Sequence, residues 1–186
     1  MKEQLSKLWR LLSLPKNLQL YIMRLTQNEF LIGVTGVILN ANNEVLICKH
    51  NYRQIKWSLP GGYIKGREHP KEGLVREIEE ETGFIVRIGK QLRIRTDRET
   101  ARLDISFVGS YIGGEFRPSH EVSEARFFSF ENLPVLSQNQ LLLIKEVLQR
   151  QTNVKTGQSN KTVFTLLREK LQSSHFAIKL RRDKSD

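Results

Sequence analysis

The sequence predicts an α/β domain in which helices cover a mixed β-sheet. Two observations support this fold class. Apolar runs rich in β-branched residues recur from residue 30 onward, and a helix with clear start and stop signals interrupts them near residue 70. We therefore expect one domain at residues 30–151, with a helical extension at 1–29 and a linker, short helix and basic tail at 152–186.

The predicted strands are short and apolar, with turn-forming residues at their ends. The turn NANN separates the first two strands, and the segment NYRQIKWSLPGG that follows them is expected to be a loop with a short extended piece. The strands are expected at residues 30–39, 44–50, 85–96, 102–112 and 125–130.

Two helices are expected inside the domain. Pro70 stands where a first helical residue is favoured and Gly83 where a left-handed residue ends a helix, so the first helix should span residues 70–82. His69 would be a poor N-cap, and we expect it to be an exposed loop residue. The second helix is expected at residues 138–151, before a polar linker.

The N-terminal extension is amphipathic. Leu5, Leu8 and Leu12 lie at helical spacing, and Pro15 interrupts the pattern before a second helical stretch. Leucines with basic residues would also suit a helix lying on a membrane surface through residues 1–25. We favour packing on the domain or across a homodimer, because this is the common fate of amphipathic helices.

The charge balance indicates an anionic partner. The chain carries 30 Lys and Arg against 20 Asp and Glu, a net charge of +10. Phosphate-bearing metabolites, nucleic acid and an anionic membrane all match this sign. The single cysteine, Cys48, excludes an internal disulfide and is expected to be a buried strand thiol. No apolar run is as long as a membrane span, so the expected location is cytoplasmic.

Against this basic background, the helix near residue 70 concentrates carboxylates. Glu77, Glu80 and Glu81 lie on one face of it, where like charges repel, and near its C-terminal end, where the helix dipole disfavours anions. A solvated acidic face is one explanation. We favour the other, a site for a hard divalent cation such as Mg²⁺, which takes carboxylate oxygens together with substrate phosphates.

The spacing of these residues is more specific than helix chemistry alone. After Gly62 come five residues, Glu68, seven residues, and then the run REIEEETGF at residues 76–84. This arrangement resembles the Nudix box of the Nudix hydrolases at every fixed position. The resemblance implies an α/β/α sandwich around a mixed sheet, and an enzyme that uses Mg²⁺ or Mn²⁺ to cleave the diphosphate of a nucleoside diphosphate linked to another moiety.

The resemblance also implies roles for the box residues. Glu77, Glu80 and Glu81 match metal ligands of the family, and Glu68 matches a glutamate that supports the metal site. Arg76 matches the arginine that holds these carboxylates by ion pairing, and glycines such as Gly61 and Gly62 match those that shape the loops.

The sequence does not single out one residue as the general base. A carboxylate must accept a proton from the attacking water. Glu77 and Glu80 in the box are options, and the later loop RPSHEVSEARFF offers Glu121 and Glu124. For Glu124 we favour a structural ion pair, for example with Arg126, so Glu121 is the loop residue kept as a catalytic candidate.

The substrate is predicted only by class. Basic residues before the box and in the strand region after it, with the glycines of the box, are the candidate substrate contacts: Arg53, Gly61, Gly62, Arg95 and Arg98. We expect a nucleoside triphosphate or a nucleotide sugar of the ADP-ribose type, although the downstream proline common in ADP-ribose pyrophosphatases is absent. The alternatives are action on the 5′ end of RNA, with nucleic acid not favoured, and a non-catalytic nucleotide-binding regulator.

Overall fold

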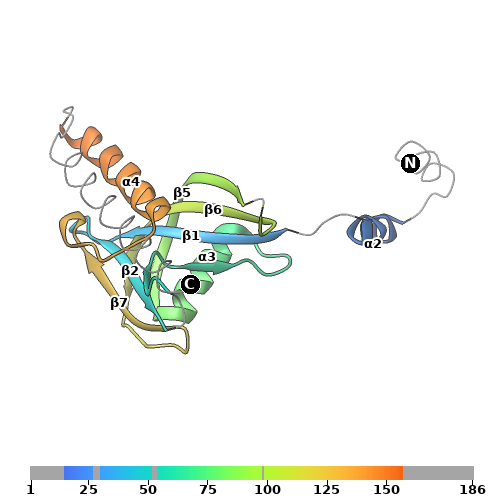
Figure 1. Cartoon of the computed structure of the whole chain (residues 1–186), viewed down its shortest axis with the longest axis horizontal. Helices are drawn as coiled ribbons and strands as arrows, with labels where there is room; N and C mark the ends of the chain where they lie inside the picture. Colours follow the sequence, from blue (N-terminus) through green and yellow to red (C-terminus); the bar gives the residue numbers. More distant parts are fainter. Residues whose placement is uncertain (1–14, 27–29, 52–53, 98, 157–186) are drawn as a thin grey trace, which may run out of the picture.

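The computed structural model describes residues 15–26, 30–51, 54–97 and 99–156, and it confirms the predicted α/β class. A mixed sheet lies between helices on its two sides (Figure 1). In chain order the elements are α2 (Lys16–Thr26), β1 (Leu31–Leu39), β2 (Val45–His50), β3 (Trp57–Ser58), β4 (Gly61–Tyr63), α3 (Pro70–Thr82), β5 (Phe84–Asp97), β6 (Arg102–Gly114), β7 (Val122–Phe128), the 3₁₀ turn η1 (Phe130–Asn132) and α4 (Gln138–Thr156).

The sheet is mixed because β1 and β6 run parallel, whereas the other strand pairs are antiparallel. The strand order is β3-β2-β1-β6-β5, with β4 added beside β1 and β7 beside β2. β1 and β2 are paired only at Leu39 and Val45, so the sheet opens into two wings from this point. One wing holds β4, β1, β6 and β5, and the other holds β3, β2 and β7.

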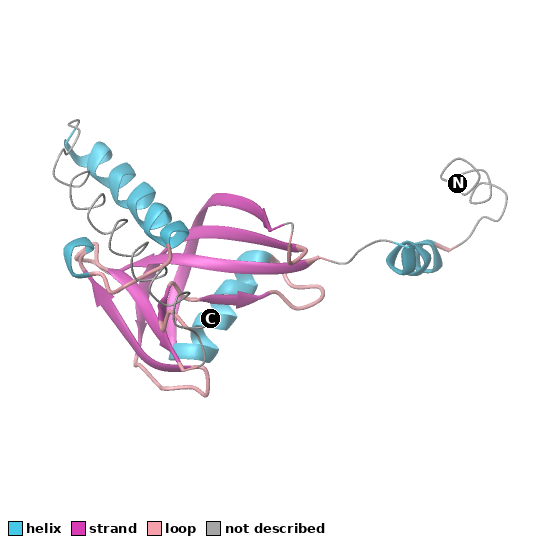
Figure 2. Ribbon diagram, in the orientation of Figure 1, coloured by secondary structure: helices cyan, strands magenta, loops and turns pink. Residues whose placement is uncertain are grey.

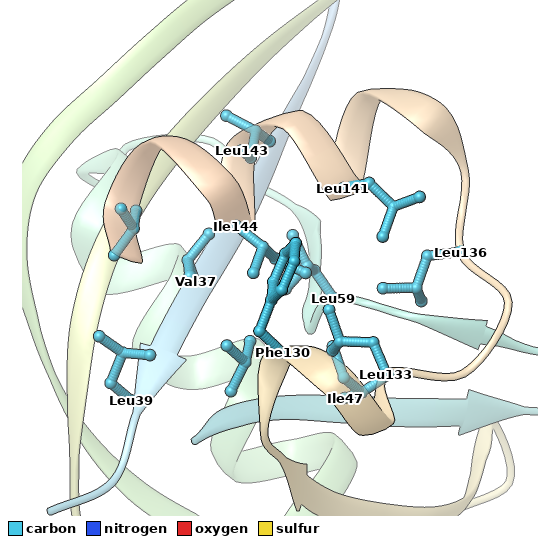
Figure 3. Packing of buried hydrophobic residues seen from close by; sticks show 12 residues of the cluster. Val37, Leu39, Ile47, Leu59, Phe130, Leu133, Leu136, Leu141, Leu143 and Ile144 are labelled. Carbon is cyan, nitrogen blue, oxygen red and sulfur yellow. The ribbon is translucent and has the colours of Figure 1, made fainter. Parts of the chain in front are cut away.

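Alternate residues of β1 face two separate cores, one under each helix. Val34 and Ile38 pack with Leu74 and Ile78 of α3. On the other face, Val37 and Leu39 pack beneath α4, where Leu141 and Ile144 cover them together with Phe130 (Figure 3). The two layers of helix around one sheet are visible in Figure 2, and they hold α3 and the start of α4 against opposite faces.

The ends of α3 agree with the sequence, with one correction. Pro70 is its first residue, and Gly83 ends it in the left-handed conformation at φ 74°. His69, expected to be a mere loop residue, is in fact the N-cap. Its Nδ1 accepts the backbone N–H of Lys71 at 3.3 Å, and Glu72 in turn accepts the N–H of His69 at 3.0 Å. An imidazole nitrogen thus does what a serine oxygen usually does in a capping box.

Several predicted boundaries shift. β7 begins at Val122 rather than 125, and Phe130, predicted as strand, starts a 3₁₀ turn. α4 continues to Thr156, so residues 152–156, predicted as the start of a linker, belong to this helix. The loop before the box contains two short strands, β3 and β4. Cys48 is buried in β2 as expected.

The predicted N-terminal helix is only partly within the described residues. α2 lies beyond the end of β1 (Figure 1), and its apolar side chains Leu18, Tyr21 and Leu25 are exposed. Residues 1–14, 27–29 and 157–186 lie outside the described part, as do the predictions made for them. Among the helices that are described, none is both long and apolar enough to span a bilayer.

Candidate active site

A single guanidinium ties the acidic residues of the box together. Arg76 donates from Nε and Nη2 to the two carboxylate oxygens of Glu68, at 2.7 and 3.0 Å. Its Nη1 donates to Glu77 at 2.7 Å and to Glu80 at 3.0 Å, and Nη2 also reaches the backbone carbonyl of Tyr63 at 3.1 Å. The planar fork of arginine suits such a multidentate arrangement. Arg76 therefore sets the positions of three carboxylates at once.

The same contacts shift the pKa values of Glu68 and Arg76. The hydrogen bond from Arg76, with one from the backbone N–H of Lys65, lowers the pKa of Glu68 from 4.5 to about 2. The hydrogen bond to Glu68, with those to Glu77 and Glu80, raises the pKa of Arg76 above its usual value. Glu68 is thus a carboxylate throughout the physiological pH range.

Two glycines let the acids come this close. A Cβ added to Gly62 would overlap the Glu77 carboxylate, so only a glycine leaves that side chain its place beside β4. A Cβ on Gly73 would come within 2.9 Å of both Glu68 Oε2 and Ile64 Cγ2. The absence of a side chain at Gly73 thus leaves room for the Glu68 carboxylate.

The donor set suits a hard cation. Glu68, Glu77, Glu80 and Glu81 offer oxygen ligands alone, as Mg²⁺ and Mn²⁺ prefer. These carboxylates differ in solvent exposure: Glu80 is 55% exposed, Glu77 18% and Glu81 6%. Within the described residues no three acidic, histidine or cysteine side chains already converge to hold an ion. Arg76 lies among the carboxylates instead, and ion binding would require them to draw together.

A pocket of about 230 Å³ lies on the other side of β4. The backbone of Gly61 and Gly62 forms one wall, and strands β1, β5 and β6 form the floor. Residues at the start of α4 close it, among them Asn139 and Gln140. Because Gly62 faces Glu77 across β4 and the pocket lies beneath α4, a ligand filling the pocket could reach the carboxylates around this edge strand.

Comparison with known proteins identifies this arrangement. The NUDIX domain family matches residues 29–151. The chain belongs to the Nudix family. It is a Nudix hydrolase, a pyrophosphohydrolase, as the box predicts.

Relatives of this Nudix domain differ in their named substrates. An ADP-ribose pyrophosphatase of Methanocaldococcus jannaschii is 33% identical over 123 residues, 63% of this chain and 72% of the relative. An RNA pyrophosphohydrolase of Zymomonas mobilis is 37% identical over 57 residues, 30% of this chain and 37% of the relative. The solved structure of an ADP-ribose pyrophosphatase from Streptococcus suis is 26% identical with a TM-score of 0.56, covering 65% of this chain and 93% of that one.

The predicted substrate residues separate into two groups. Gly61, Gly62 and Arg95 line the pocket of the Nudix domain, whereas Arg53 and Arg98 lie outside the described residues. Arg93 and Arg102 line it as well. Asp104 and the first turn of α4 were not singled out from the sequence, because only the strand register and the fold of α4 bring them here.

The two candidate bases of the later loop also differ. Glu121 is exposed at the start of β7, a strand in contact with α3, and its carbonyl accepts the N–H of Asn51 at 3.0 Å. Glu124 forms the expected structural ion pairs, with Arg126 at 2.6 Å and with Lys49. Nearby, Trp57 of β3 packs edge-on against Phe128 with 5.5 Å between ring centroids.

The ion pairs of Glu124 predict a pH-dependent stability. The hydrogen bond from Lys49, together with the nearby charge of Arg126, lowers the pKa of Glu124 below its usual 4.5. A carboxyl with a lowered pKa stabilises the fold above 4.5 and loses this effect as the pH falls further. We expect Glu124→Gln to reduce the free energy of unfolding more at pH 7 than at pH 3.5, measured by urea denaturation. The exposed Glu115→Gln serves as control, and an equal loss at both pH values would contradict this prediction.

Proposed function

We propose that the chain cleaves the diphosphate of a nucleoside diphosphate linked to a sugar, of the ADP-ribose type, with Mg²⁺ or Mn²⁺. The observation that carries the proposal is the carboxylate cluster around Arg76, which shares the edge strand β4 with a basic pocket. The ADP-ribose pyrophosphatases among the relatives support this substrate type. They outweigh the absent downstream proline, because a missing short tag is weak evidence.

The carboxylates would hold the ion, and Arg76 would set their positions. Glu77, Glu80 and Glu81 are the proposed ligands, with Glu68 completing the set. A bound divalent ion neutralises phosphate oxygens and acidifies a water molecule. Glu68 stays ionised because Arg76 lowers its pKa, so it keeps its charge at neutral pH.

A carboxylate oxygen must also accept the proton of the attacking water. Glu121 is the proposed acceptor, because it is exposed and immediately precedes β7, a strand that contacts α3. Glu77 and Glu80 remain the alternatives. If Glu121→Gln keeps full kcat at every pH while Glu77→Gln does not, the acceptor lies in the box.

The proposal is tested by product release from a panel of substrates with Mg²⁺, Mn²⁺ or chelator. The panel contains ADP-ribose, nucleotide sugars, nucleoside triphosphates, dinucleoside polyphosphates and 5′-triphosphorylated RNA. We expect metal-dependent turnover of ADP-ribose or a nucleotide sugar. Glu80→Gln should lower kcat by about a hundredfold or more, because even indirect partners of metal sites are worth roughly 10- to 100-fold.

Glu79→Gln is the matched control, since Glu79 lies next to Glu80 on α3 but outside the fixed positions of the box. An equal loss in both variants would indicate a general charge effect rather than a site. Preferred turnover of triphosphorylated RNA would replace the proposed substrate with the 5′ end of RNA. Nucleotide binding without turnover of any substrate would instead favour the regulator.

A further inference from the structure

The floor of the pocket under α4 is built from two rows of residues in register across four strands, and these residues are polar except for two glycines. Strand pairing aligns Arg95 of β5 with Asp104 of β6, Gly33 of β1 and Tyr63 of β4. The neighbouring row aligns Arg93, Ser106, Thr35 and Gly61. All eight residues line the pocket. Polar side chains therefore point from this part of the sheet towards α4, where an apolar core would otherwise continue.

Positive charge exceeds negative charge in this pocket. Arg93, Arg95 and Arg102 line it, and Asp104 is the one carboxylate among the described residues of the lining. Asp104 accepts a hydrogen bond from Arg102 Nη2 at 3.1 Å, and its carboxylate forms ion pairs with Arg102 Nε at 2.9 Å and with Arg95 at 3.6 Å. A Cβ on Gly33 would come within 2.7 Å of Asp104 Oδ1, so this glycine leaves the carboxylate its place between the two arginines.

Acidic residues near the pocket do not neutralise its excess of positive charge. Glu146 of α4 accepts from Arg93 at 3.1 Å, but it also accepts from Arg150 at 2.8 Å. Asp97 lies across from Arg102 in the β5–β6 ladder, where its Oδ1 accepts the backbone N–H groups of Glu99 and Thr100. Asp104 and Glu146 are thus each shared between two guanidiniums.

The start of α4 adds to the positive potential. Ser137, Asn139 and Gln140 line the pocket, so the N-terminal end of this 19-residue helix faces the arginines. The helix dipole places a partial positive charge at this end. Side-chain guanidiniums and the helix end together suit a phosphate group better than an uncharged sugar or base.

We propose that this pocket binds a phosphate that the substrate carries in addition to its scissile diphosphate. The preferred substrates would then be nucleoside diphosphate sugars phosphorylated on one of their two halves. This inference rests on the proposed function. The scissile diphosphate itself belongs at the carboxylates, which lie across β4 from the pocket. At about 230 Å³ the pocket is below the usual range for whole small molecules, which starts near 300 Å³, and it fits one part of a substrate.

The test compares ADP-ribose with two phosphorylated forms, one carrying the phosphate on the adenosine ribose and one on the terminal ribose. The wild type should prefer one of these forms in kcat/KM. Arg95→Gln should lower that preference about tenfold, because one charge-assisted contact to phosphate is lost. Arg87→Gln, an exposed arginine of β5 outside the lining of the pocket, should leave the preference unchanged.

Calorimetric binding of the same compounds in chelator separates this inference from the proposed function. Tighter binding of a phosphorylated form, reduced by Arg95→Gln, supports the pocket even if no compound is hydrolysed. Equal affinity for all three compounds in the wild type overturns the inference. So does an equal loss in Arg95→Gln for ADP-ribose and for the preferred form, since the arginines would then act on the scissile diphosphate.

Discussion

Replacement of Arg76 by lysine is expected to lower kcat by about a hundredfold or more while the protein still folds. Arg76 makes five hydrogen bonds with one planar group, two of them to Glu68. An ammonium group has the same charge but three donors around a single atom, so it cannot hold Glu68 in two places and reach Glu77 and Glu80 as well. The carboxylates would lose the anchor from which we propose that they draw together around the metal ion.

Steady-state turnover of ADP-ribose at several Mg²⁺ concentrations measures the effect. If the arginine acts by positioning, the Mg²⁺ concentration for half-maximal activity should rise together with the fall in kcat. Arg87→Lys on β5 provides the control. Retention of full activity in Arg76→Lys, with an unchanged requirement for Mg²⁺, would show that charge alone is sufficient and that the observed geometry is not needed.

Local signals in the sequence predicted the parts of the site that depend on a single helix. Pro70 and Gly83 delimit α3 correctly, and the spacing of the box placed its glutamates on one face. His69 was underrated as a cap because imidazole is a rare N-cap, although Glu72 three residues later completes a capping box. Helix start and stop signals, together with the spacing of the family motif, were therefore sufficient to predict α3 and the face that carries its glutamates.

Features that depend on pairing between distant segments could not be predicted in the same way. Ser123 and Glu124 are weak strand formers, and residues 122–124 join β7 because they pair with the end of β2. The lining of the pocket under α4 could not be predicted from the sequence for the same reason. Arg95 and Asp104 are nine positions apart, and Gly33 and Gln140 are farther still, so only strand register and the packing of α4 bring them together.

Substitution of Gly62 by alanine should also cause a large loss of activity. It tests the contact of Glu77 with β4, whereas Arg76→Lys tests the ion pairs of the carboxylates. The new Cβ would overlap the carboxylate of Glu77, which is held between β4 and the guanidinium of Arg76. Because Glu77 cannot keep both its place and its ion pair, we expect activity to fall roughly 10- to 100-fold, as for other displaced partners of a metal site. Overpacking should also cost about 1–3 kcal/mol of stability.

Gly66→Ala is the matched control, four residues further along the chain in the turn that follows β4. A Cβ at Gly66 would meet no atom within 4 Å. Adding the methyl group there should leave activity intact and stability unchanged or slightly raised, because alanine reduces the freedom of the unfolded chain. If Gly62→Ala matched Gly66→Ala in both turnover and urea denaturation, the position of Glu77 beside β4 would not matter for catalysis. A selective loss in Gly62→Ala would instead show that the site depends on a close contact between strand backbone and carboxylate, which no other residue type at position 62 permits.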